Sequence, residues 1–138
     1  MSKLYHGSCT CGAVKFEANI DFSNTTTGRC NCSLCGKLRF WSIKVKPEEF
    51  RYTSPQPESE TLTDFILTTD VIHNPFCKKC GVHAFHRGDV PEYGGAYVSV
   101  SISCLEDVEL EVLEKAKVWY ADGKNNNWWS EPKEKKIM

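Results

Sequence analysis

Apolar and polar residues alternate along several short stretches of this chain, and this pattern is typical of half-buried β-strands. Other short stretches are rich in β-branched and aromatic residues, which also favour strands. Together the two patterns predict six strands, over residues 13–17, 41–45, 61–69, 71–76, 97–102 and 117–120. The sequence therefore predicts a mainly β fold.

The segment 105–117 carries two patterns at once. Val108, Leu110 and Val112 alternate as in a strand. Leu105, Val108, Val112 and Leu113 also fit one stripe of a helix. Five acidic residues in the same segment suit a solvated helix or turn. We expect a short helical turn here.

The chain has 138 residues, which is the size of one domain. No repeat, low-complexity tract or break in composition divides it, and the polar, proline-containing stretch 54–59 is typical of a surface loop. We assign residues 1–124 to one folded domain and residues 125–138 to a partly ordered C-terminal tail.

Composition and charge argue against several classes of function. Apolar residues make up 41% of the chain and charged residues 25%, as in ordinary globular proteins. The net charge of −1 gives no reason to expect nucleic acid or an anionic membrane as a partner. No apolar run approaches the roughly 18 residues that span a bilayer. Because the first residues also lack the apolar stretch of a signal peptide, we expect a cytoplasmic protein without nucleic-acid or membrane partners.

Eight cysteines are the unusual feature of the composition. Seven lie in three groups, and Cys104 stands alone; the groups are Cys9-x-Cys11, Cys30-x-Cys32-x-x-Cys35 and Cys77-x-x-Cys80. In a reducing compartment such thiols serve as metal ligands, and spacings of one or two residues let two sulfurs reach one ion. The spacing therefore favours zinc over disulfides.

Coordination number divides these seven thiolates between two zinc ions. Structural zinc takes four protein ligands, whereas catalytic zinc keeps one position open. A C-x-C pair and a C-x-x-C pair complete a closed structural site from Cys9, Cys11, Cys77 and Cys80. A glycine follows the second cysteine of each pair, at Gly12 and Gly81, and permits the tight turn that such a site needs.

Cys30, Cys32 and Cys35 then form a three-thiolate site with one open position. A small thiol that entered this position would lose its proton to the metal.

Other residues could instead close the three-cysteine site. The candidates for a fourth ligand are Cys104 and the four histidines, His6, His73, His83 and His86. A lone cysteine at a strand end is more often an inert buried thiol. In a strand, the spacing of His83 and His86 puts them on opposite faces, so we expect at most one to face a metal, as a neighbour of the ligands or a proton shuttle.

Five segments of the chain resemble the glutathione-dependent formaldehyde-activating enzyme / centromere protein V family. They are residues 7–17, 30–35, 76–83, 98–105 and 122–128, and the three cysteine blocks occur in the family's order. The resemblance implies a β-tent fold of antiparallel sheets organised around zinc knuckles. It also implies two zinc ions per chain, a structural one at the four-cysteine site and one assigned to activity at Cys30, Cys32 and Cys35.

The resemblance further implies a carbon–sulfur lyase that joins glutathione and formaldehyde into S-hydroxymethylglutathione. In this reading Cys30, Cys32 and Cys35 carry the catalytic zinc, while Lys37 and Arg39, together with Lys44, bind the carboxylates of the thiol. His83, His86 or Tyr93 would protonate the alkoxide that forms when the thiol attacks the aldehyde. After Cys35 the run of residues 36–41 is bulkier than in the formaldehyde enzyme, so we expect a reshaped mouth to the pocket.

Two other functions are compatible with the residues. The first is a non-enzymatic zinc module for protein interaction or thiol carriage, in which Trp128 and Trp129 form the contact surface or pack as a lid on the sheet. The second is nucleic-acid binding, which the pI of about 6.4 and the absence of a recognition-helix pattern oppose. The chain also lacks the basic N-terminal extension expected of chromatin-associated relatives. The sequence leaves the oligomeric state open.

Overall fold

Ten strands are the main regular structure of the protein in this computed structural model, which describes residues 1–138. The strands are β1 (Lys3–Ser8), β2 (Lys15–Ile20), β3 (Thr27–Cys30), β4 (Trp41–Val45), β5 (Phe50–Tyr52), β6 (Leu62–Phe65), β7 (Ile72–Cys77), β8 (Phe85–Val90), β9 (Gly95–Ser101) and β10 (Val118–Ala121). Three short helices connect them, α1 (Ser33–Leu38), α2 (Glu58–Thr61) and α3 (Leu110–Lys115). Four 3-10 turns complete the regular structure, at Pro47–Glu49, Pro91–Tyr93, Ile102–Cys104 and Gly123–Asn125.

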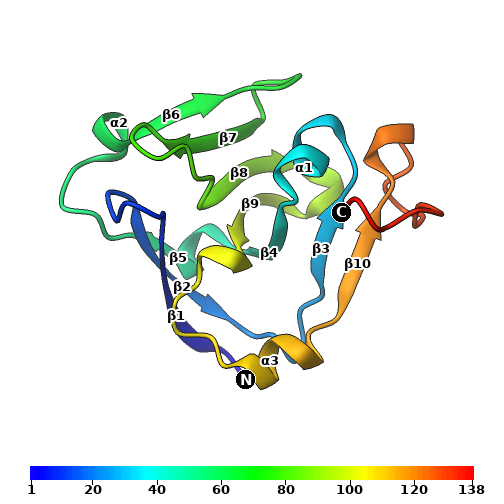
Figure 1. Ribbon diagram of the computed structural model, residues 1–138, viewed down its shortest axis with the longest axis horizontal. Coiled ribbons are helices and arrows are strands. Elements are labelled where there is room, and N and C mark those ends of the chain that lie inside the picture. The colour runs from blue at the N-terminus through cyan, green and yellow to red at the C-terminus, as the bar shows by residue number, and fades with distance from the viewer.

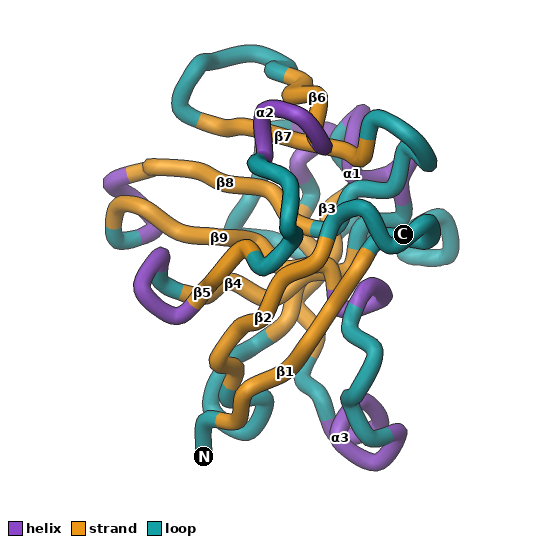
Figure 2. Tube along the Cα trace, turned by 90° about the vertical axis from the view of Figure 1, so that its left-hand side faces the viewer, coloured by secondary structure: helices purple, strands orange, loops and turns teal.

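The strands form two sheets (Figure 1). The smaller sheet has the order β1-β2-β5, and the larger has the order β10-β3-β4-β9-β8-β7-β6. All pairs are antiparallel except β10 and β3, which run in parallel. Figure 2 shows the hairpin of β6 and β7 at one end of the molecule, beyond β8 and β9. Within the larger sheet the last strand of the chain, β10, lies beside β3, which comes early in the chain.

The hydrophobic core lies between the two sheets. Alternation in β2 turns Phe16, Ala18 and Ile20 inward, and in the larger sheet Ile43 and Val100 are almost fully buried. Because successive residues of a strand point to opposite faces, the intervening residues of β4 and β9 lie on the other face of the larger sheet. That second face carries the candidate site described below.

An aromatic cluster fixes the packing between the sheets. The Phe85 ring of β8 lies 4.7 Å from that of Phe50 and 6.2 Å from that of Phe16, measured between centroids. Phe16 and Phe50 stack on one another at 5.5 Å. Aromatic pairs at these separations add to the stabilisation that burial provides. These contacts therefore fix the position of the smaller sheet relative to β8.

All six predicted strands are present, as β2, β4, β6, β7, β9 and β10, although several end one to four residues away from the predicted bounds. The predicted helical turn within 105–117 is also confirmed, as α3. Four strands were not predicted, namely β1, β3, β5 and β8. The mainly β class is confirmed, and no helix is long and apolar enough to cross a bilayer.

Candidate metal centres and the adjoining cavity

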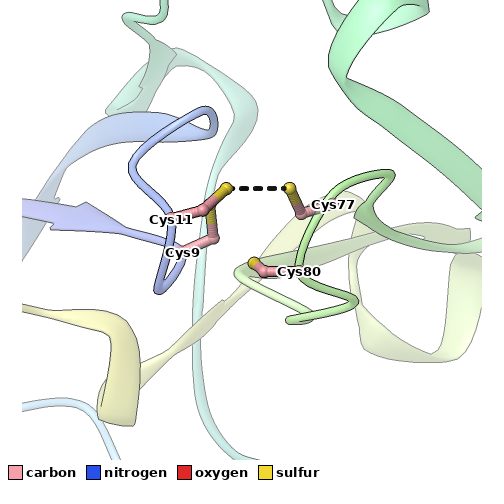
Figure 3. A group of neighbouring side chains, drawn as sticks. All are labelled: Cys9, Cys11, Cys77 and Cys80. Atoms are coloured by element: carbon pink, nitrogen blue, oxygen red, sulfur yellow. Dashed lines mark hydrogen bonds between the residues drawn. The ribbon is translucent and has the colours of Figure 1, made fainter.

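Four cysteine sulfurs meet where a turn of the smaller sheet approaches a turn of the larger one (Figure 3). Cys9 and Cys11 come from the turn after β1, while Cys77 ends β7 and Cys80 lies in the turn that follows. Cys11 Sγ lies 3.7 Å from Cys9 Sγ and 3.6 Å from Cys77 Sγ. The cluster therefore bridges segments 66 residues apart in sequence.

The two turns that present these sulfurs have the same backbone design. Gly12 and Gly81 adopt φ values of 80° and 77°, which favour glycine, as the sequence predicts for tight turns. The Gly12 amide donates to the Cys9 carbonyl and the Gly81 amide to the Cys77 carbonyl. The Val14 amide points at Cys9 Sγ at 3.3 Å and the Lys79 amide at Cys77 Sγ at 3.4 Å. Amide hydrogens aimed at sulfur stabilise the thiolate form that binds metal.

The four-cysteine cluster fits a tetrahedral metal. Zinc–sulfur bonds of about 2.3 Å in a tetrahedron place neighbouring sulfurs about 3.8 Å apart. The measured separations of 3.6 and 3.7 Å agree with this spacing, and all four sulfurs lie within 4.8 Å of one another. These residues can hold a metal ion.

Three other cysteine sulfurs form a second cluster at the end of β3. Cys30 ends that strand, Cys32 caps α1, and Cys35 lies inside α1, with all three sulfurs within 4.8 Å of one another. The Cys32 amide approaches Cys30 Sγ at 3.3 Å, and the Cys35 amide approaches Cys32 Sγ at 3.4 Å. No histidine, carboxylate or further cysteine shares this cluster. It supplies three ligands where the first cluster supplies four.

A hydrogen-bonded anchor ties the second cluster to the chain after β10. The side-chain amide of Asn31 donates to Asp122 at 2.9 Å, and the Asn31 side-chain oxygen accepts from the Lys124 amide at 2.9 Å. Hydrogen bonds from Asn125 and Asn31 hold the pKa of Asp122 below its ordinary value, so this carboxyl is ionised at neutral pH. In Figure 1, α1 and the chain after β10 lie at the same end of β3. These hydrogen bonds fix the position of Asn31, which lies between Cys30 and Cys32 in the sequence.

A cavity of about 1010 Å³ opens beside the three-cysteine cluster. Its walls include Cys30, Cys32 and Cys35, the α1 residues that follow, and aromatic side chains of β9, β10 and the C-terminal segment. Its floor is the outer face of the larger sheet. There the register places Lys44 and His86 on either side of Ser99, so the three side chains form a row across β4, β9 and β8.

Three basic residues predicted to bind carboxylates, Lys37, Arg39 and Lys44, all line this cavity. Lys44 makes no ion pair; its Nζ lies 5.2 Å and 5.3 Å from the ring centroids of Tyr93 and Tyr97. Although water reaches the Lys44 side chain, the protein around it removes enough solvent to lower the pKa of its ammonium group. An anion bound in the cavity would relieve that loss of solvation.

The structure corrects the prediction that His83 and His86 lie on opposite faces of a strand. Strand β8 begins at Phe85, so His83 precedes it and the alternation does not apply. Instead His83 Nδ1 lies 2.8 Å from His86 Nε2, and the His86 ring stacks on Phe40 at 4.2 Å. Burial lowers the pKa of His86 to about 3 and also lowers that of His83, so both rings are neutral at pH 7. Of the two, only His86 lines the cavity.

The remaining candidate ligands lie elsewhere. Cys104 Sγ points at the His83 carbonyl oxygen at 3.8 Å, and burial raises the pKa of its thiol. His6 pairs with Asp107, and His73 pairs with Asp64. None of these side chains joins a cysteine cluster. Trp128 and Trp129 both line the cavity, with the Trp128 ring against Gly123 and Trp129 largely exposed.

Comparison with known families agrees with this arrangement. A family model described as glutathione-dependent formaldehyde-activating enzyme matches residues 4–122, which include all seven clustered cysteines. The chain belongs to this family. A crystal structure of a Rhodobacter sphaeroides protein, solved as a structural genomics target, resembles this family member with a TM-score of 0.63 at 25% sequence identity. The match covers 83% of this chain and 99% of that one.

Several cavity residues of this family member were not singled out from the sequence. Tyr97 and Ser99 lie on the cavity face of β9, opposite the buried Val98 and Val100, so the alternation itself contained this signal. Gly88 permits the placement of Tyr97, because a Cβ there would lie 2.4 Å from the tyrosine oxygen. No sequence pattern indicated that Asp122 holds Asn31 in place, because the two residues are 91 positions apart in the sequence.

The anchor at Asn31 gives a first prediction. Asn31→Ala removes the hydrogen bonds to Asp122 and Lys124, so the loop between Cys30 and Cys32 loses its fixed position. Loss of such a supporting contact weakens metal binding about tenfold or more. We expect this loss at the three-cysteine cluster alone, measured by competition with a chromophoric chelator. Asn24→Ala, which removes a surface contact to Asp21, is the matched control and should leave both affinities unchanged.

Proposed function

We propose that this protein is a zinc-dependent carbon–sulfur lyase that joins a glutathione-like thiol to a small aldehyde, acting in a reducing cytoplasm. The observation that carries the proposal is a cluster of only three cysteines in the wall of a large cavity, whereas the cluster of four does not line that cavity. Membership of the glutathione-dependent formaldehyde-activating enzyme family supports the choice of thiol and aldehyde. A structural metal has no need of a cavity, whereas a reactive one needs access for substrate.

Seven cysteines would hold two zinc ions. Cys9, Cys11, Cys77 and Cys80 would enclose the structural ion, and Cys30, Cys32 and Cys35 would hold the reactive one. A zinc ion at the second cluster supplies a Lewis acid that lowers the pKa of a bound thiol and so favours its nucleophilic form.

Binding and orientation of the thiol fall to the basic side chains. Lys44 lies on the cavity floor without a carboxylate partner, and Lys37 and Arg39 extend from α1 and its end. Two carboxylates of a glutathione-like peptide would pair with these groups while its sulfur faces the three cysteines. The pairing holds the thiol in one orientation, so the aldehyde meets it in a productive geometry.

Proton transfer falls to the histidine pair. Formation of the carbon–sulfur bond turns the carbonyl oxygen into an alkoxide, which must gain a proton as the thiol loses one. His86 faces the cavity and its Nε2 lies 2.8 Å from His83 Nδ1. Each neutral ring has one N–H and one free nitrogen, so the pair can take up the proton that the thiol loses and return it to the alkoxide, which leaves both rings neutral at the end.

The test is the rate of adduct formation. Exchange NMR on isotope-labelled formaldehyde should show faster formation of the glutathione adduct with the zinc-loaded protein than with glutathione alone. Cys35→Ala should abolish that gain, while Cys104→Ala, which removes a thiol outside both clusters, should retain it. Thiols add to formaldehyde unaided, so equal rates with and without the protein would contradict the proposal.

A further inference from the structure

Three aromatic rings form a continuous wall along one side of the cavity. The Tyr93 ring centroid lies 6.1 Å from that of Tyr97 and 6.0 Å from that of Trp129, with interplanar angles of 71° and 64°. All three side chains line the cavity. Edge-to-face contacts at these distances hold the rings in fixed relative positions. We call this group the aromatic wall.

Folding alone does not account for the aromatic wall. Trp129 is 71% exposed and Tyr93 is 39% exposed, so much of their apolar surface faces water. Trp128, the neighbouring tryptophan, differs because its ring packs against Gly123 beside Cys30. A single exposed aromatic residue is common on protein surfaces, but contiguous rings that line a cavity mark a site for an apolar group.

The volume of the cavity also suits a carbonyl compound larger than formaldehyde. Cavities that take drug-sized ligands measure about 300–1,000 Å³, and this one measures about 1010 Å³. A one-carbon aldehyde has no substituent that could contact Trp129 while its carbonyl carbon lies beside the three cysteines. A planar ring carried on the carbonyl carbon extends further into the cavity and offers an apolar face to the wall.

Lys44 lies against two rings of the aromatic wall. Its Nζ lies within 5.3 Å of both tyrosine ring centroids, and it occupies the cavity floor next to Ser99. The cation thus stands where the aromatic wall meets the region that would bind the thiol's carboxylates. An apolar group against the rings and an anion beside the ammonium group can therefore be bound at once.

We propose that Tyr93, Tyr97 and Trp129 form a subsite for an aromatic substituent, and that the carbonyl substrate is an aromatic aldehyde. This inference rests on the proposed function for the reaction, but the subsite can be tested without turnover. Aromatic contacts of this kind favour the ring-bearing ligand over its small counterpart by about tenfold.

Calorimetry on the zinc-loaded protein tests the subsite with two glutathione thioethers that differ only in the group on sulfur. S-benzylglutathione should bind about tenfold more tightly than S-methylglutathione. Trp129→Ala should remove most of this advantage and leave the affinity for S-methylglutathione unchanged. Tyr93→Leu should also remove most of the advantage. Tyr93→Phe, which keeps the ring, should preserve the advantage.

Each other result has a definite meaning. Three results would overturn the aromatic subsite, even where formaldehyde turnover is confirmed. They are equal affinity for the two thioethers, failure of both to bind, and a benzyl advantage that survives both Trp129→Ala and Tyr93→Leu. A preference for the benzyl compound that depends on these residues, without any acceleration of adduct formation, supports the subsite and contradicts the proposed reaction instead.

Discussion

Cys77→Ser is expected to leave the chain largely unfolded. Cys77 is buried at the end of β7, and its sulfur meets those of Cys9 and Cys11 from the other sheet. Metal binding to zinc-finger peptides contributes about 10–16 kcal/mol of folding free energy. A whole domain of this size is stable by only about 5–15 kcal/mol, so loss of one ligand in four removes a decisive share. Far-UV circular dichroism and thermal denaturation measure the effect.

Cys104→Ser is the matched control for that experiment. Cys104 is half-buried, lies outside both clusters and points its sulfur at the His83 carbonyl oxygen, so the similar-sized serine should leave the thermal transition close to that of the original protein. Removal of metal with a strong chelator should reproduce the Cys77→Ser result. A Cys77→Ser protein with an unchanged thermal transition would show that the four-cysteine cluster does not stabilise the fold.

Gly123→Ala is expected to weaken metal binding strongly at the three-cysteine cluster while the fold survives. A Cβ at this position would lie 2.7 Å from Cys30 Sγ and 2.5 Å from the Trp128 ring. Both distances are too short for non-bonded atoms, so either the sulfur or the indole must move. Displacement of a ligand sulfur should lower the metal affinity about a hundredfold, the upper end for changes around a metal site. Metal analysis after dialysis should return the equivalent held by four cysteines and lose the other.

Gly36→Ala provides the comparison for Gly123→Ala. Gly36 lies in α1 directly after Cys35, and its added methyl would meet nothing closer than the Asn31 carbonyl oxygen at 3.4 Å. Alanine also favours the helical conformation over glycine. We expect unchanged metal content in this variant. Retention of both metal equivalents by Gly123→Ala would contradict the tight packing of Cys30 against the segment after β10.

The cysteine clusters could be predicted from the sequence because the number and spacing of the cysteines can be read within short segments. Pairs of cysteines one or two residues apart can share a metal, and four ligands close a site whereas three do not. The glycines after Cys11 and Cys80 likewise indicate turns by their own conformational freedom. Strands with strict alternation, such as β4, were predicted for the same reason, since their pattern does not depend on a partner.

Other features depend on contacts that no local pattern contains. Strand β3 has only four residues, one of them glycine, and it becomes a strand by pairing with β4 and β10. Strand β8 contains Arg87, Gly88 and Asp89, and its place between β7 and β9 decides its conformation. The error over His83 and His86 has the same origin, because the start of β8 could not be located.

The parallel pairing of β3 with β10 sets the order in which the protein can mature on the ribosome. Cys30, Cys32 and Cys35 leave the exit tunnel long before Asp122, which anchors the loop between them. During synthesis these three thiols are exposed on an incomplete sheet, open to oxidation or to the wrong metal. We therefore expect the second cluster to reach its full metal affinity only after the carboxyl-terminal part of the chain has emerged and folded back.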